Sequence, residues 1–260
     1  PKGSESLRQR FSWFAAGGPI ASILLALVAW VLSALFSPPA FAFYLLYTVA
    51  AFSGLIALAT LIPSRMGGFS SDGMRILTFL QNGPTAKADL ANLQALAHIR
   101  AGAPYEELPT DLFEEVAADE KVPKQQRVSI DYFRYLQLLA QGEVAEAHQR
   151  YNKVMEGLDA YPAGSHGGFY LEQAILEAQY LNNVPAAEAA LAKAQDGPMT
   201  EALSRHLAEA AIAARKEDWK ILTEQLPQIE KLIPSGMDQS RTPIIKNWVD
   251  SWKDALPTAN

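Results

Sequence analysis

The feature that most constrains this chain is a long stretch without a single charged residue. From Phe11 to Ser64 the sequence contains no Asp, Glu, Lys, Arg or His. A helix needs about 20 apolar residues to cross the roughly 30 Å hydrocarbon core of a membrane, so the stretch is long enough for two crossings. The Pro-Pro pair at 38–39 interrupts it, because proline cannot sit inside a continuing helix. The sequence therefore predicts two transmembrane helices, near Phe14–Phe36 and near Phe41–Ile62, joined as an antiparallel hairpin.

Two alternatives to a membrane hairpin are open. The apolar region of a cleaved signal peptide is about 7–15 residues long, whereas this stretch is far longer and doubled. A hairpin buried in a soluble protein is the second alternative, but it would be unusual for such a hairpin to have no charged face at all. The lipid bilayer is therefore the expected surrounding of these two helices.

Basic residues on both sides of the stretch predict its orientation. Three of them (Lys2, Arg8 and Arg10) precede the first span, and two (Arg65 and Arg75) follow the second, while the connection is uncharged. Because basic segments tend to stay in the cytoplasm, both ends of the hairpin are expected there and the Pro-Pro turn outside. The predicted localisation is an integral protein of a membrane such as the bacterial inner membrane, with a cytoplasmic carboxyl-terminal domain.

The rest of the chain is acidic and contains no cysteine. Residues 1–75 carry five Lys or Arg and two Asp or Glu, a net charge of +3, so the total of −6 leaves −9 for residues 76–260. No nucleic acid is expected as a partner, because phosphate contacts need a basic face. The lack of cysteine excludes disulfides and thiol chemistry and fits a reducing compartment.

The second part of the sequence predicts only helices. We expect a membrane domain over residues 1–83 and a cytosolic helical-repeat domain over residues 84–260. Within the latter, three segments share a helix–turn–helix pattern spaced by roughly 34 to 40 residues. Their expected turns lie at Gly142, at Asn182-Asn183 and at Lys216-Glu217, and residues 242–256 are expected to form a capping helix with Trp248 and Trp252 on one face.

These repeats resemble tetratricopeptide repeats in the small and large residues of their second helices. Ala147 precedes Tyr151 in the first repeat, and Ala187, Leu191 and Ala194 occupy similar positions in the next. Helix pairs of this kind bury their apolar faces by stacking into a solenoid, which offers an extended surface to other proteins. The predicted fold class is therefore all-α: a transmembrane hairpin followed by a tetratricopeptide-like solenoid that binds a protein partner.

A cluster of special residues follows the second span, in the segment LIPSRMGGFSSDGMRIL over residues 61–77. Pro63 ends the span, and Gly67-Gly68 predicts a flexible loop. Residues 70–72, Ser-Ser-Asp, are all suitable N-caps for a helix that starts near Gly73. Asp72 therefore has a structural role available to it, which is to accept backbone N–H groups and to favour the helix dipole.

Two elements of the membrane part together resemble the second half of the membrane core in site-2-protease-like intramembrane zinc metalloproteases. Gly18-Pro19 matches the Gly-Pro-x-x-Asn element of that family, with Ser22 in place of Asn. Pro63 matches its Asn-x-x-Pro element, with Thr60 in place of Asn, and Asp72-Gly73 matches the following Asp-Gly. The resemblance covers about residues 11–80.

The resemblance implies a zinc cofactor with Asp72 as its third protein ligand. In the family the other two ligands are the histidines of an upstream His-Glu-x-x-His, whose Glu is the general base. This chain has no such motif, and its histidines (His98, His148, His166 and His206) all follow Asp72 and lack a second His at i+3 or i+4. We therefore expect no catalytic residue within this chain, and expect the His-Glu segment to lie upstream of Pro1; the alternative is a protein that never had it.

The resemblance also implies a function and a substrate. The complete protein is expected to hydrolyse peptide bonds of a membrane protein substrate, with the helical repeats recruiting that substrate or a regulator. The residues expected to shape the substrate groove are Gly18, Pro19, Ser22, Thr60, Pro63 and Gly73. The alternative is a non-catalytic, membrane-anchored helical-repeat scaffold.

Overall fold

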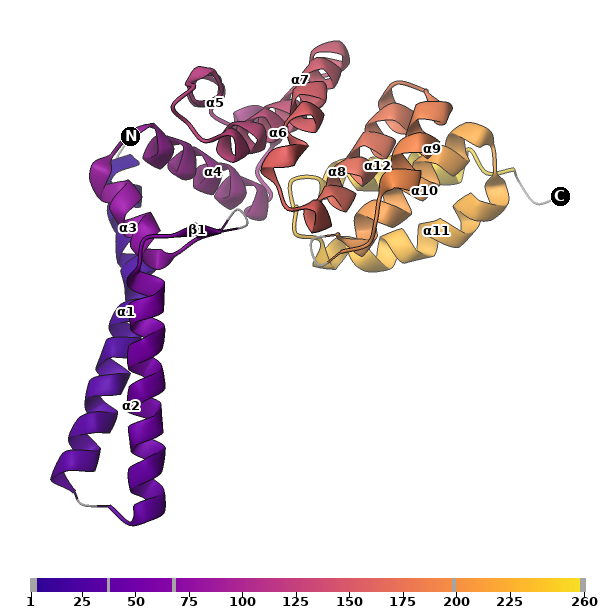
Figure 1. The fold of residues 1–260 in the computed structure, drawn as a ribbon. Helices are drawn as coiled ribbons and strands as arrows, with labels where there is room; N and C mark the ends of the chain where they lie inside the picture. The colour runs from indigo at the N-terminus through magenta and orange to yellow at the C-terminus, as the bar shows by residue number, and fades with distance from the viewer. Residues whose placement is uncertain (1–3, 37, 67–68, 198–199, 258–260) are drawn as a thin grey trace. The chain divides into compact units, whose positions relative to one another are not determined.

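The computed structural model describes residues 4–36, 38–66, 69–197 and 200–257. Over these residues the fold is all-helical apart from one antiparallel ladder of two-residue strands, and it divides into two compact units, Pro1–Leu90 and Ala91–Asn260. Figure 1 shows the elements in chain order. Lys2 and the Gly67-Gly68 pair, for which a basic flank and a flexible loop were predicted, lie outside the described residues.

The first unit contains two long helices, a short ladder and a third helix. The chain enters α4 (Pro84–Arg100) before this unit ends, so the border between the units falls inside that helix. The elements before it are α1 (Ser4–Leu35), α2 (Ala40–Leu61), β1 (Arg65–Met66), β2 (Phe69–Ser70) and α3 (Asp72–Gln81). The ladder pairs Arg65 with Ser70 and Met66 with Phe69.

The two apolar helices pack against each other as a hairpin (Figure 1). Both are long and apolar enough to cross a membrane, over Arg8–Leu35 and Ala40–Leu61. The first helix begins well before the predicted Phe14, because the polar residues ahead of the apolar stretch continue the same helix. Small residues are among the buried positions of the two helices, and small side chains let helix backbones approach closely; those buried are Ala15, Ala29, Ser33, Ser53 and Ala57.

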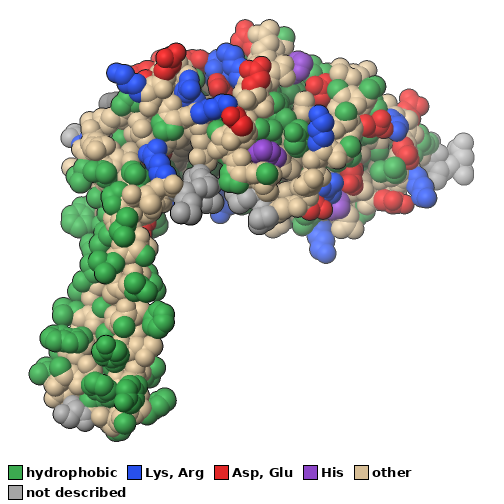
Figure 2. Space-filling model, viewed as in Figure 1, with side chains coloured by type: hydrophobic (Ala, Val, Ile, Leu, Met, Phe, Trp, Pro, Cys, Tyr) green, Lys and Arg blue, Asp and Glu red, His purple; other side chains and the backbone are tan. Residues whose placement is uncertain are grey.

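The outer surface of the hairpin is apolar. Its large side chains are exposed, from 38% for Leu61 to 80% for Phe41, and Figure 2 shows them covering the visible face of the hairpin. In water, an exposed apolar surface of this extent would be costly and is typical of a binding or membrane surface. Among the residues described, no charged side chain lies on the hairpin between Arg10 and Arg65.

The second unit consists of helices joined by short turns. Its α-helices after α4 are α5 (Thr110–Ala118), α6 (Lys124–Ala140), α7 (Val144–Glu156), α8 (His166–Ile175), α9 (Val184–Lys193), α10 (Ala202–Lys216), α11 (Trp219–Leu232) and α12 (Thr242–Asp254). Single 3₁₀ turns are η1 (Tyr105–Glu107), η2 (Leu158–Ala160), η3 (Ala163–Ser165) and η5 (Ile233–Ser235), and η4 (Leu176–Tyr180) is a π-helical turn.

The turns of this unit lie where the sequence predicts them. Gly142 separates α6 from α7 with a φ of 80°, and Asn182 and Glu217 adopt left-handed backbone conformations of φ 52° and 57°. Glycine and asparagine adopt this conformation at low cost, whereas Glu217 does so at the end of α10 without that advantage. The helices on either side of each turn pack against each other, as α6 with α7, α8 with α9, and α10 with α11.

Contacts in the second unit also join its first and last segments. The Ser240 hydroxyl donates to the Ala103 carbonyl oxygen at 2.5 Å, and the Ser240 N–H donates to the Ile99 carbonyl oxygen at 3.3 Å. The Tyr105 hydroxyl donates to the Asp238 carboxylate. In a simple repeat array each repeat contacts only its neighbours, so these contacts add a closure that the repeat pattern did not predict.

Candidate functional site

The candidate site is built around the start of α3, and Ser71 is the residue that caps this helix. The Ser71 hydroxyl accepts the Met74 N–H at 3.2 Å and the Ser64 N–H at 3.0 Å, and donates to the Ile62 carbonyl oxygen at 2.7 Å. One hydroxyl therefore caps α3 and fixes the chain that leaves α2. Of the three cap candidates predicted from the sequence, the middle one has this role, and Asp72 is the first residue of the helix itself.

The Asp72 side chain lies against the first helix. A Cβ atom placed on Gly18 would be 3.5 Å from Asp72 Oδ2, which is ordinary van der Waals contact. The absence of a side chain on Gly18 thus leaves the carboxylate oxygen next to the backbone of α1, one residue before Pro19. Two sequence elements more than fifty positions apart, Gly18-Pro19 and Asp72-Gly73, meet at this point of the first unit.

Gly73 is required by a close approach between two helices. A Cβ atom on residue 73 would lie less than 3.0 Å from the carbonyl oxygen of Leu61 at the end of α2, a separation that real Cβ atoms essentially never show. Only glycine lets α3 start this near to α2. The Asp-Gly pair therefore combines a carboxylate facing α1 with a backbone in contact with α2.

The other predicted groove residues have varied surroundings. Pro19 is buried inside α1, and Ser22 lies half-buried one turn further on. The Thr60 hydroxyl donates within its own helix, to the carbonyl oxygens of Ile56 at 3.0 Å and Ala57 at 3.2 Å. Its proton is therefore engaged, whereas its lone pairs stay available. Pro63 is exposed just after α2.

Metal donors do not gather around Asp72 in the part of the chain that the structure describes. Within that part, no three His, Cys, Asp or Glu residues come together as a group that could hold a metal ion. A catalytic zinc ion takes three protein ligands and leaves a fourth position open. Asp72 supplies one such ligand, so the described residues do not by themselves fit a zinc site.

The four histidines have other contacts, all in the second unit. His98 Nε2 donates to the Pro104 carbonyl oxygen at 2.6 Å, and His166 Nε2 lies 3.0 Å from the Tyr161 carbonyl oxygen. His206 Nδ1 lies 2.6 Å from Gln225 Oε1, and His148 Nε2 lies 3.6 Å from Glu177 Oε1. Each of the four imidazoles therefore has an oxygen atom of the second unit as a neighbour.

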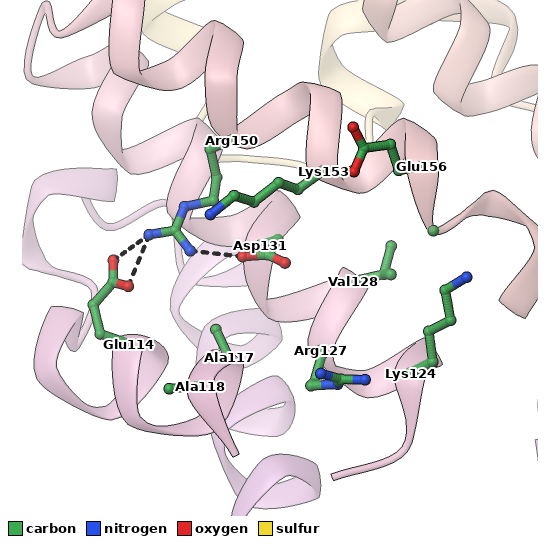
Figure 3. Close-up of a pocket in the computed structure, with 11 residues that line it drawn as sticks. Glu114, Ala117, Ala118, Lys124, Arg127, Val128, Asp131, Arg150, Lys153 and Glu156 are labelled. Carbon is green, nitrogen blue, oxygen red and sulfur yellow. Dashed lines mark hydrogen bonds and ion pairs between the residues drawn. The ribbon is translucent and has the colours of Figure 1, made fainter. Parts of the chain in front are cut away.

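The second unit contains a polar cavity of about 490 Å³ between α5, α6 and α7 (Figure 3). Arg150 lies at one end of it and links two acids: its Nη2 is 2.6 Å from Glu114 Oε1, and its Nη1 is 2.7 Å from Asp131 Oδ1. Lys124, Arg127, Lys153 and Glu156 line the remainder. The lining of the cavity carries four basic and three acidic side chains, so the cavity has little net charge to attract a ligand.

The two acids beside Arg150 respond to it differently. Burial raises the pKa of Glu114, but the hydrogen bonds and charges of Arg150 and Arg134 outweigh this effect, so the pKa lies below its usual value. Asp131 is more deeply buried, and burial raises its pKa above the usual value even though Arg150 opposes the shift. The same guanidinium therefore stabilises the ionised form of Glu114 fully and that of Asp131 only in part.

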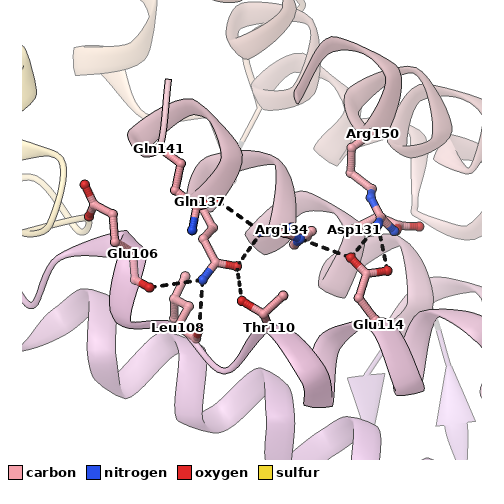
Figure 4. Close-up of polar contacts among 9 residues, drawn as sticks. All are labelled: Glu106, Leu108, Thr110, Glu114, Asp131, Arg134, Gln137, Gln141 and Arg150. Atoms are coloured by element: carbon pink, nitrogen blue, oxygen red, sulfur yellow. Dashed lines mark hydrogen bonds and ion pairs between the residues drawn. The ribbon is translucent and has the colours of Figure 1, made fainter. Parts of the chain in front are cut away.

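A buried amide next to this network organises the start of α5 (Figure 4). Gln137 Nε2 donates to the carbonyl oxygens of Glu106 at 3.3 Å and Leu108 at 2.9 Å. Gln137 Oε1 accepts from Arg134 Nη1 at 2.9 Å and from the Thr110 hydroxyl at 3.1 Å. Three of these bonds hold the start of α5 and the segment before it against α6, and the bond from Arg134 lies within α6. The arrangement indicates a structural network and not a catalytic one.

The sequence did not reveal that Asp72 touches Gly18, and it gave no indication of cavities in the second unit. Both depend on how distant segments pack, which no local pattern encodes. Comparison with protein-family models, with curated proteins and with solved structures found no match.

Proposed function

We propose that this chain is the carboxyl-terminal part of a membrane-embedded zinc metalloprotease of site-2-protease type, which hydrolyses peptide bonds of membrane-associated proteins. The observation that supports this most is the position of Asp72. Its carboxylate lies beside Gly18 while the neighbouring Ser71 caps α3. Because Ser71 provides the cap, capping does not account for the position of the Asp72 carboxylate beside α1.

In this proposal the hairpin of α1 and α2 spans the membrane. Support comes from its length, its lack of charge and its exposed apolar surface. Aromatic side chains are enriched at membrane interfaces, and exposed ones occur near both ends of the hairpin: Trp13 and Phe14 at one end, Phe36, Phe41 and Tyr44 at the other. The basic flanks favour a cytoplasmic position for both ends, and the membrane would be the inner membrane of a bacterium.

Asp72 would provide one zinc ligand, and two histidines from outside residues 1–260 would provide the others. Bound zinc in such a site lowers the pKa of a water molecule toward neutrality and polarises the peptide carbonyl group. The residues near Asp72 would shape the groove for the substrate: Gly18, Pro19, Ser22, Thr60, Pro63 and Gly73. Among these, Gly18 leaves room for the carboxylate, and Gly73 holds α3 at the end of α2.

The second unit would recruit a protein, either the substrate or a regulator. Its consecutive helix pairs, its short turns and its acidic composition support a tetratricopeptide-like arrangement with this role. The closing contacts of Ser240 and Tyr105 would make that arrangement more rigid than an open array.

Replacement of Asp72 by Asn in the complete protein tests the proposal. Ser71 caps α3 and Asp72 is its first residue, so the change to Asn leaves the cap in place, keeps the size of the side chain and removes its negative charge. We expect zinc content and cleavage of a membrane substrate to fall sharply while the melting temperature stays within about 2 °C of the wild-type value. Normal zinc content and normal cleavage in Asp72→Asn would rule out Asp72 as a ligand.

A non-catalytic membrane-anchored scaffold is the second candidate, favoured by the lack of a metal-binding group among the residues described. The coding sequence upstream of Pro1 separates the two. A His-Glu-x-x-His on an apolar helix supports the protease, and an upstream sequence without it supports the scaffold. Reporter fusions at Pro39 and Asn260 test the common membrane topology, which predicts an external Pro39 and a cytoplasmic Asn260.

A further inference from the structure

A second cavity of about 310 Å³ lies within the second unit, and its walls are aromatic and acidic. It opens between α6, α8, α10 and the segment that leads into α12, and three aromatic rings form one side of it. The Phe169 ring lies 6.1 Å from the Tyr132 ring and 5.2 Å from the Tyr161 ring, measured between centroids. Pockets that combine aromatic walls with a few polar groups are the usual form of a ligand site.

One of the acids in this cavity is already neutralised. Arg241 donates to both carboxylate oxygens of Glu172, at 2.6 Å and 3.0 Å, and both side chains are buried. The Tyr135 hydroxyl donates to the same carboxylate at 2.8 Å. This buried ion pair is complete by itself, so it forms part of the wall of the cavity and leaves no charge for a ligand to neutralise.

Two further acids in the cavity have no cation. Glu201 Oε1 accepts the Met237 N–H at 3.1 Å, and Asp238 accepts the Arg241 N–H at 3.1 Å and the Tyr105 hydroxyl. In the described part of the chain, neither carboxylate forms an ion pair with Lys, Arg or His. Burial raises the pKa of Asp238 even though the hydrogen bond from Tyr105 and the charge of Arg241 oppose the shift.

The charged residues that line the cavity are three acids, Glu172, Glu201 and Asp238, and one cation, Arg241, so its net charge is negative. In agreement with this, burial raises the pKa of Tyr132 well above its usual value and the three acids raise it further, whereas Arg241 opposes the shift. Aromatic faces attract cations as well, most strongly where water is excluded. The aromatic rings and the two unpaired carboxylates thus favour the same kind of ligand.

We infer that this cavity binds the positively charged end of an arginine or lysine side chain presented by a partner polypeptide. The aromatic rings would receive the apolar stem, and Glu201 and Asp238 would accept hydrogen bonds from the guanidinium or ammonium group. A cavity of about 310 Å³ is large enough for a single long side chain and too small for a folded element. The net charge of −9 over residues 76–260 would attract a basic segment to the unit from a distance.

The inference rests on the proposed recruiting role of the helical unit, because it specifies the chemistry of the recruited partner. Its test measures binding and not proteolysis. If the cavity fails to bind a cation, the proposed role of Asp72 is unaffected, and if Asp72 proves to be only structural, the binding result still stands.

The experiment uses the full chain in lipid nanodiscs and measures binding of small probes by saturation-transfer NMR titration. The probes are N-acetyl-arginine methylamide, its uncharged analogue N-acetyl-norleucine methylamide, and N-acetyl-glutamate methylamide. We expect the arginine probe to bind at least about tenfold more tightly than either of the others. A single charge-assisted hydrogen bond contributes enough binding free energy to lower the Kd about tenfold. Equal binding of the norleucine probe, or tighter binding of the glutamate probe, overturns the inference.

Variants locate the binding site. Glu201→Gln and Asp238→Asn should each weaken binding of the arginine probe about tenfold, and Phe169→Leu should weaken it about threefold. Glu156→Gln in the other cavity is the matched control and should leave binding unchanged. Because Gln can still accept the Met237 N–H, Glu201→Gln should fold even if Asp238→Asn does not. Unchanged binding in a folded Glu201→Gln variant overturns the inference.

Two further probes distinguish the source of the cation. Acetyl-Ala-Arg-Ala-methylamide presents the side chain on a peptide backbone, whereas butylguanidinium is a free organic cation of the same chemistry. Tighter binding of the peptide supports a polypeptide partner. Equal or tighter binding of butylguanidinium overturns the assignment to a polypeptide.

Discussion

The carbonyl oxygen of Leu61 occupies the space that a side chain on Gly73 would need. This relationship fixes the start of α3 at the end of α2, and Asp72 immediately precedes the contact. The Asp-Gly pair is therefore defined as much by backbone packing as by the carboxylate. Any larger residue at position 73 has to move α3 away from α2.

The first prediction concerns this contact. Gly73→Ala should destabilise the first unit by about 2–3 kcal/mol, because the added methyl group meets backbone atoms that cannot rotate away. Gly54→Ala is the matched control, since a Cβ atom at that helical position meets nothing within 4 Å. Thermal unfolding in detergent measures both variants. A Gly73→Ala variant as stable as Gly54→Ala would show that the close approach is absent in solution.

The second prediction separates the position of the Asp72 carboxylate from its charge. Gly18→Ala should be tolerated, because its Cβ atom would make an ordinary contact of 3.5 Å with Asp72 Oδ2. Gly18→Val adds two methyl groups toward the carboxylate and should displace it. If Asp72 binds zinc in the complete protein, Gly18→Val should lower zinc content at least about tenfold while Gly18→Ala retains it. Equal zinc content in the two variants would contradict a role for this contact.

A third prediction compares two ion pairs of the second unit. Arg150→Met removes the partner of Asp131, whose side chain is only 13% exposed, and should destabilise the unit by about 2–3 kcal/mol. Lys124→Met removes the partner of Asp159, which is 73% exposed, and should leave the urea midpoint nearly unchanged. Urea unfolding followed by circular dichroism at 222 nm measures the difference. Similar losses in the two variants would mean that the Arg150 network is solvated.

The fourth prediction is a pH dependence with a definite sign. Because the pKa of Glu114 is lowered in the folded state, its ionisation stabilises the fold above the unfolded pKa of about 4.3, and this contribution disappears as the pH falls through the folded pKa. Glu114→Gln should therefore be less stable than the wild type at pH 7, and the difference should shrink progressively below about pH 4.3. Unfolding midpoints at pH 7, 5 and 3 test this, and a difference that grows toward pH 3 would contradict it.

The contribution of Asp131 to stability depends on pH in the opposite direction. Its pKa is raised, so the folded state binds its proton more tightly than the unfolded state does. Stability from this group therefore decreases as the pH rises from the unfolded pKa of about 3.9 to the folded value. When the stability of Asp131→Asn is measured as a function of pH, this decrease should be absent. The result distinguishes the variant from Glu114→Gln.

Local signals in the sequence predicted much of the helical part and the candidate residues of the site. The charge-free stretch gave the two apolar helices, and Gly142 and Asn182 marked turns because their backbone conformations are costly for most other residues. The first helix nevertheless extends further toward the amino terminus than predicted, because hydropathy defines the apolar span and not the end of a helix. The sequence Ser-Ser-Asp left three possible caps. Ser71 is distinguished from the other two by the hydrogen bonds of its hydroxyl with the backbone of Ile62 and Ser64, which only the structure shows.

Contacts between distant segments could not be predicted from the sequence. The pairing of Glu172 with Arg241 joins positions 69 apart, and neither residue has a neighbour in the sequence that indicates the other. The π-helical turn at Leu176–Tyr180 is likewise absent from the periodic pattern, since the sequence around it reads as one uninterrupted helix. The acidic, aromatic cavity depends on these contacts and so became visible only in the structure.

The contacts of Ser240 with Ile99 and Ala103 have a consequence for how the second unit unfolds. An open array of repeats can unravel from either end, one repeat at a time, because each repeat is held only by its neighbours. Here the segment after α4 and the segment before α12 hold each other, so the helices between them cannot separate pair by pair without breaking bonds that span most of the unit. The high contact order of this closure should make folding slower and unfolding all-or-none. The unit would then resist mechanical force as a single body, even though its helices are arranged in successive pairs.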